Sequence, residues 1–241
     1  MDSIRGSQNY LIETAIQHIS ESVFVGLCHK LGTSELVAMS RDMMDLEDMV
    51  DNLIASDGIS VMVSGSLREG LRLKGSDLDF MGWPNKHRVI WELSQSQYYN
   101  THRQTLILCD CSDSPPGFTL LYLLSPNMNR QVQGACVRMN KRLYISSSLY
   151  RQIMCSESIR KSTQHGPCAS GKLGTLDIDT AYCFVSDFWP PPAYSWIDRC
   201  HSWPKPHVVD DIVKNGCHFV AIGHKLGRHE DYEWRVSFSL A

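Results

Sequence analysis

The chain has 241 residues, 43% of them hydrophobic, which is enough to bury a core as one sizeable domain or two small ones. Its formal net charge of −3 argues against a constitutive nucleic-acid binder, because such proteins usually carry a strongly basic face. Nine cysteines, an odd number without a visible secretory signal, favour reduced thiols and a cytoplasmic location, and the apolar runs are too short to span a bilayer.

The N-terminal part of the chain is predicted to form two long helices. Apolar residues recur there at helical spacing, and Gly32 is predicted to end the first helix. Thr33 or Ser34 is expected to cap a second helix, whose apolar stripe runs over residues 36–53. We assign residues 1–58 to these helices and expect them to pack on a core domain formed by the rest of the chain.

The elements after the helices are predicted from apolar patterns and turn signals. Residues 86–145 are interpreted as a meander of strands. The predicted strands are Ile59–Ser64, Phe80–Trp83, His87–Leu93, Thr105–Cys109, Phe118–Leu124, Gln131–Met139, Ala181–Val185, Cys217–Ile222 and Glu233–Leu240. The predicted helices are Ser146–Ser156, Tyr194–Cys200 and His207–Asn215. Ser162–Gly174 is small, polar and rich in glycine, which indicates a loop, either beside a cleft or as a connector.

Two short motifs between residues 65 and 79 carry most of the chemical information. Gly65 and Ser66 follow an apolar strand and offer unhindered backbone N–H groups and a hydroxyl to an anionic oxygen. Asp77 and Asp79 alternate on a predicted strand, so both carboxylates point to one face, about 6–7 Å apart, where they can share a divalent metal. Each motif alone is typical of a surface loop, but their order between apolar strands favours a site for phosphate and metal.

A third carboxylate is expected from the segment that begins near residue 177. Two-metal nucleotidyl transfer needs a third acid to complete the site and to help activate the attacking hydroxyl. Asp177 and Asp179 both precede an apolar run, and either one can reach a strand beside Asp77 and Asp79. Spacing alone does not choose between them, and both are also compatible with a simple strand start.

These motifs, together with the closing segment Glu233–Ser239, resemble the Mab-twenty-one-like nucleotidyltransferases, the family that includes cyclic GMP-AMP synthase and the cyclic GMP-AMP synthase-like receptors. Gln164–Cys168 and Ser195–Arg199 are similar to its mollusc members. The resemblance covers nearly the whole chain and implies an α+β nucleotidyltransferase fold, a twisted mixed β-sheet flanked by helices in one continuous domain over residues 59–241. A C-terminal helical lobe follows in the family; because the sequence stops at Ala241, we expect a fragment or a shortened product without that lobe.

The resemblance also implies a role for each matching residue. Asp77, Asp79 and Asp179 would be the catalytic acids and would bind two Mg²⁺ or Mn²⁺ ions. The implied nucleotide-binding residues are Gly65 and Ser66, which would grip a triphosphate, and Arg235, Ser237 and Ser239, which would contact a base. ATP and GTP would be the substrates and a cyclic dinucleotide the product, made in innate immune signalling.

Two alternatives and one partner stay open at this level. A non-catalytic nucleotide-binding or interaction module of the same family is the main alternative, and a purely structural domain is the other. A double-stranded RNA or DNA activator would need a local basic patch, although such clusters are also typical of a solvated face. The two candidate patches are Arg68, Arg72 and Lys74, and Arg138, Lys141 and Arg142.

Overall fold

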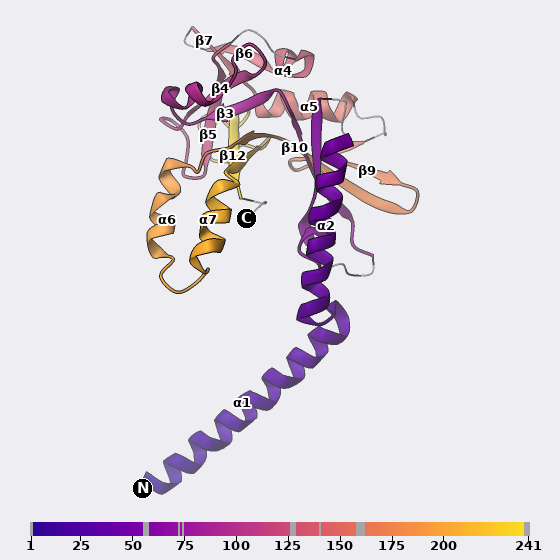
Figure 1. The fold of residues 1–241 in the computed structure, drawn as a ribbon, viewed down its shortest axis with the longest axis vertical. Helices are drawn as coiled ribbons and strands as arrows, with labels where there is room; N and C mark the ends of the chain where they lie inside the picture. Colours follow the sequence, from indigo (N-terminus) through magenta and orange to yellow (C-terminus); the bar gives the residue numbers. More distant parts are fainter. Residues whose placement is uncertain are drawn as a thin grey trace.

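The computed structural model describes residues 2–54, 58–71, 73, 75–125, 129–139, 141–157 and 162–238, with only the backbone described at residues 2–11 and 51–54. Two long helices open the chain, α1 (Asp2–Leu31) and α2 (Ser34–Ile54). Gly32 separates them in a left-handed conformation (φ +99°), and the Thr33 hydroxyl accepts a 3.4 Å hydrogen bond from the Leu36 amide. Both predicted helix boundaries are therefore confirmed. In Figure 1, α2 runs along one side of the body and α1 extends away from it.

The body is built on a mixed sheet that contains twelve strands within the described residues. Its main path is β1 (Ile59–Ser64), β2 (Leu78–Pro84), β10 (Leu176–Ser186), β11 (Cys217–Val220), β12 (Glu233–Ser237), β5 (Phe118–Leu123), β4 (Thr105–Asp110) and β3 (His87–Ile90). Beside this path lie β6 (Cys136–Met139), β7 (Arg142–Ile145), β8 (Thr163–His165) and β9 (Cys168–Leu173). The pairs β2–β10 and β3–β4 are parallel and the others antiparallel, which confirms the predicted α+β class with a mixed sheet.

Short helices surround the sheet. They are α3 (Gly65–Arg68), α4 (Arg130–Gly134), α5 (Ser147–Glu157), α6 (Tyr194–Arg199) and α7 (Pro206–Lys214), with 3-10 turns at η1 (Leu93–Tyr98) and η2 (Pro191–Ala193). Figure 1 places α6 and α7 together on one side of the body and α2 on the other. Among the described residues, no helix combines the length and the apolar character that a membrane crossing requires.

Strand β10 organises the core because it is shared by both halves of the sheet. Its first half lies between β2 and β9, and its second half pairs with β11. Phe184 on β10 is fully buried, and its ring packs 5.0 Å from Trp234 and 5.1 Å from Tyr150. The Trp234 indole N–H donates to the Ile145 carbonyl at 2.8 Å, so this buried nitrogen of the aromatic cluster is satisfied.

Three predicted elements are wrong. One prediction overlooked a local helix cap, and in the other two the structure is determined by pairing between strands that are distant in the sequence. The strand predicted at Gln131–Met139 begins only at Cys136, because the Asn129 side chain accepts the Val132 amide at 2.8 Å and caps helix α4. The loop predicted at Ser162–Gly174 is the β8–β9 hairpin, which is held by backbone pairing to β10 that its composition does not reveal. The segment from residue 86 is not a simple meander, because η1 lies between β3 and β4 and these two strands run parallel.

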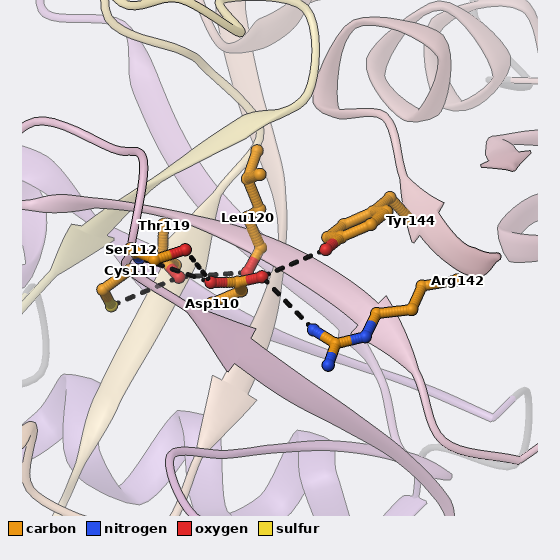
Figure 2. Close-up of polar contacts among 7 residues, drawn as sticks. All are labelled: Asp110, Cys111, Ser112, Thr119, Leu120, Arg142 and Tyr144. Atoms are coloured by element: carbon orange, nitrogen blue, oxygen red, sulfur yellow. Dashed lines mark hydrogen bonds and ion pairs between the residues drawn. The ribbon is translucent and has the colours of Figure 1, made fainter. Parts of the chain in front are cut away.

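A polar cluster around Asp110 ties β7 to the sheet (Figure 2). The Asp110 carboxylate accepts hydrogen bonds from the Ser112 hydroxyl at 2.6 Å and the Tyr144 hydroxyl at 3.0 Å, and the Arg142 guanidinium lies 3.6 Å away. Burial opposes the charge, but the Ser112 and Tyr144 hydrogen bonds and Arg142 outweigh it and lower the pKa of Asp110. Arg142 also stacks 4.7 Å above the Tyr122 ring. The polar contacts of this cluster therefore serve to hold the strands together.

Candidate active site

Three carboxylates meet at one end of the parallel pair β2–β10. Asp79 on β2 is directly opposite Asp179 on β10, and Asp77 lies two residues before Asp79. One ligand oxygen from each of Asp77, Asp79 and Asp179 lies within 4.8 Å of the other two. Acids that are about a hundred residues apart in the sequence therefore converge at one place, as predicted for a shared site.

The same register separates Asp179 from Asp177. Asp177 is opposite Lys172 on β9, and the Lys172 ammonium lies 2.8 Å from the Asp177 carboxylate in an exposed ion pair. Asp179 is opposite Ser170 and turns toward β2 and the other acids. Of the two candidates for the third carboxylate, the structure thus brings Asp179 into the cluster.

The Gly-Ser turn lies directly against the acid cluster. Ser64, the last residue of β1, is opposite Asp79, and α3 begins at the next residue. Gly65 has a φ of +63°, and a Cβ atom on it would lie 2.1 Å from a carboxylate oxygen of Asp79. Only glycine fits both the backbone conformation and this approach. Gly65 and Ser66 therefore lie next to the acids, where a phosphate bound by the turn would also meet the metal ligands.

The raised pKa of Asp79 reflects its burial and the excess of negative charge in the cluster. Burial, followed by the neighbouring Asp77 and Asp179, raises the pKa of Asp79. Burial, followed by Asp179 and Asp79, raises the pKa of the nearby Cys168 thiol to about 11, and Arg235 acts in the opposite direction. Cys168 is therefore a neutral thiol at neutral pH. The sequence pattern does not connect Cys168 with the acids, because only the pairing of β9 with β10 brings it near them.

A cleft of about 1120 Å³ opens beside the acids. Its lining comes from the turn Gly75–Asp77, from the β8–β9 hairpin and from Asp177 and Asp179 on β10. This volume is slightly above the usual range for small-molecule sites, about 300–1000 Å³. The segment predicted to be a loop beside a cleft is thus a hairpin beside a cleft.

Two of the predicted base-contacting residues, Arg235 and Ser237, lie on β12. Arg235 is exposed and opposite Val220, and Ser237, two residues later on the same face, is opposite His218. The Arg235 charge acts to lower the pKa of the Cys168 thiol, against the stronger effect of burial. Ser239 lies outside the described residues.

The two predicted basic patches are partly engaged within the protein. Arg68 pairs with Asp45 and Asp48, and Arg142 pairs with Asp110. Arg72 and Lys74 lie outside the residues that the structure describes. Binding of a nucleic-acid activator by either patch stays a prediction.

The arrangement is that of a nucleotidyltransferase-type domain, in which acids at one end of two parallel strands lie beside a glycine-containing turn. A family model described as the Mab-21 protein nucleotidyltransferase domain matches residues 121–241, half of the chain. The chain therefore belongs to the Mab-21 nucleotidyltransferase domain family. The matched part contains Asp179 and Arg235, whereas Gly65, Asp77 and Asp79 precede it and join it through the pairing of β2 with β10.

Proposed function

We propose that this protein is a metal-dependent nucleotidyltransferase of the cyclic GMP-AMP synthase type that uses ATP and GTP. The convergence of Asp77, Asp79 and Asp179 within 4.8 Å is the observation that carries the proposal. Three carboxylates without a balancing cation are costly to hold together, and hard oxygen donors are those that Mg²⁺ and Mn²⁺ prefer. The residues present therefore fit a divalent metal pair.

The chain's own residues divide the work of the reaction. A hydroxyl of one nucleotide attacks the α-phosphorus of the other, a new P–O bond forms, and the bond to the pyrophosphate leaving group breaks. Asp77, Asp79 and Asp179 would hold the metals, and Asp179 would orient the attacking hydroxyl and help to remove its proton. When bound, divalent cations would lower the pKa of that hydroxyl and neutralise charge on the leaving group.

Binding and orientation would come from two further segments. Gly65 and Ser66 would hold the donor phosphates through backbone N–H groups and the serine hydroxyl. Arg235, with Ser237 and Ser239, would stack on or hydrogen-bond a base. Two successive transfers would close a cyclic dinucleotide, a product that we propose, with a cytoplasmic role in innate immunity, from the resemblance to cyclic GMP-AMP synthase. We also propose residues 59–241 as the catalytic domain and the first 58 residues as its helical support.

The acid pair on β10 offers a sharp test, because Asp177 and Asp179 share a strand but only Asp179 joins the cluster. Asp179→Asn should abolish Mn²⁺ binding and lower conversion of labelled ATP and GTP to a phosphatase-resistant product by about 100-fold or more, as expected when charge stabilisation in the transition state is lost. Asp177→Asn, the matched control, should retain both properties.

Each result separates the proposed enzyme from its alternatives. Full turnover in the Asp179→Asn variant would contradict the site assignment. Binding of ATP or GTP with Mn²⁺ but no product, in the wild type and in the control, would identify a non-catalytic nucleotide-binding module. No binding of nucleotide by the wild type would leave a structural domain.

A further inference from the structure

The Gly-Ser turn, residues 65–71, is held by its own backbone hydrogen bonds and lies between the acid cluster and helix α2. Within it, the Leu71 amide donates to the Ser66 carbonyl at 2.8 Å and the Glu69 amide to the Gly65 carbonyl at 3.3 Å. Gly65 touches Asp79 at one end of the turn, and Arg68 ends α3 at the other. The turn therefore connects the residues beside the acids to the end of α3.

Three contacts fasten this unit to α2. The Arg68 guanidinium lies 2.8 Å from Asp45 and also pairs with Asp48. The second carboxylate oxygen of Asp48 accepts the Val63 amide at 3.2 Å, which caps an open N–H group of the edge strand β1. Gly70 has a φ of +72°, and a Cβ on it would lie 2.5 Å from the Val37 carbonyl, so the chain passes directly against the helix.

The Arg68 pair is shielded more than an ordinary surface ion pair. The Arg68 side chain is 23% exposed and that of Asp48 is 14% exposed, whereas Asp45 is largely exposed. A guanidinium that binds two carboxylates has a fixed direction as well as a charge. Glycine-containing turns gain many conformations when they are not held, so a directional clamp is what a phosphate-binding turn needs.

We propose that Arg68 is a positioning residue of this site, which, through Asp48 and Asp45, lets helix α2 set the geometry in which the Gly65–Ser66 turn grips a nucleoside triphosphate. This inference rests on the proposed function. Arg68 acts through the turn and touches neither substrate nor metal.

Binding of α,β-methylene ATP with Mn²⁺ to the 241-residue chain, measured by calorimetry, tests the inference. Arg68→Met should weaken binding by about 10-fold or more, the range seen when a partner behind a binding group is removed. Arg68→Lys should restore part of the loss, because it keeps the charge but not the two-carboxylate geometry. If Arg68→Met does not fold, Asp48→Asn serves in its place, since it keeps an acceptor for the Val63 amide and should weaken binding in the same direction.

Arg88→Met is the matched control. Arg88 is 20% exposed and pairs with Asp187 at 3.3 Å beyond the far end of β10, so its loss removes a similar ion pair away from the turn. It should leave nucleotide affinity within about twofold of the wild type, as expected for a distant, independent site.

The outcomes are distinct. Wild-type affinity in the Arg68→Met variant, or an equal loss in Arg88→Met, would overturn the positioning role and leave the proposed function standing. A wild type that binds the analogue no better than an Asp77→Asn and Asp79→Asn double variant would overturn the proposed function and this inference with it.

Discussion

Gly65 shows at the scale of one residue why the acid cluster has its shape. The Asp79 carboxylate occupies the space that any larger residue at position 65 would fill. The backbone there is also left-handed, which costs an L-residue about 1–2 kcal/mol. The close approach of Asp79 to the turn therefore requires that residue 65 has no Cβ atom.

Gly65→Ala should disrupt the site more than it disrupts the fold. The new methyl group must displace Asp79 from Asp77 and Asp179, so we expect Mn²⁺ affinity to fall by about tenfold or more, in addition to about 1–2 kcal/mol of stability lost to backbone strain. Gly117→Ala is the control, because Gly117 also has a positive φ (+82°) but nothing lies within 4 Å of its added Cβ. Manganese titration and thermal unfolding distinguish the two variants, and equal Mn²⁺ affinity in both would contradict the argument.

At the scale of elements, helix α5 illustrates how a local signal and a distant contact reinforce each other. The Ser146 hydroxyl accepts the Leu149 amide at 3.2 Å and donates to the Asp231 carbonyl at 2.6 Å. The first bond caps the start of α5, and the second holds that start against the segment that leads into β12. Ser146 is almost completely buried, so water does not replace either bond.

Ser146→Ala should therefore destabilise the protein by about 1–2 kcal/mol, at the upper end of the usual cost of a lost cap. Denaturant unfolding measures the change as a lower midpoint with an unchanged slope. Thr33→Ala, which removes the exposed and longer cap of α2, should cost less. A larger loss from Thr33→Ala would show that the contact with Asp231 contributes little.

At the scale of the whole molecule, two buried histidines make stability depend on pH. His87 and His218 are 2% and 0% exposed, and neither ring nitrogen of either residue has a hydrogen-bond partner among the described residues. Burial lowers the pKa of both imidazoles to about 4, and the Arg88 charge adds to the effect at His87. An unfolded histidine has a pKa near 6.5, so between these values the unfolded chain binds protons that the folded protein does not.

The histidine contribution to stability is therefore complete above about pH 6.5 and is lost as the pH falls toward 4. We expect each histidine to remove about 2 kcal/mol of unfolding free energy between pH 7 and pH 5. His218→Phe keeps a ring against Trp83, whose centroid is 5.0 Å away, and should reduce this pH dependence. Denaturant unfolding at pH 7 and pH 5 measures this change in unfolding free energy, and the exposed His102→Gln serves as the control. If His218→Phe loses as much unfolding free energy between the two pH values as the wild type does, the explanation is refuted.

Much of the local structure could be predicted from the sequence. Gly32 and Thr33 define the junction of α1 and α2, Ser146 defines the start of α5, and the apolar runs define most strands. Near-neighbour interactions decide these features, so a short window contains the information. The Asn129 cap of α4 belongs to the same class and was missed although its signal was present.

The sequence by itself determined the composition of the site: a Gly-Ser turn, an Asp-x-Asp pair and a later pair of acids. Only the tertiary structure decided that Asp179 rather than Asp177 joins them, that Ser162–Gly174 forms a hairpin, and that Arg68 is held by α2. The physical reason is that strand register is fixed by pairing between segments about a hundred residues apart. Asp177 and Asp179 share a face of β10, so only the register with β2 decides which of them lies opposite Asp79.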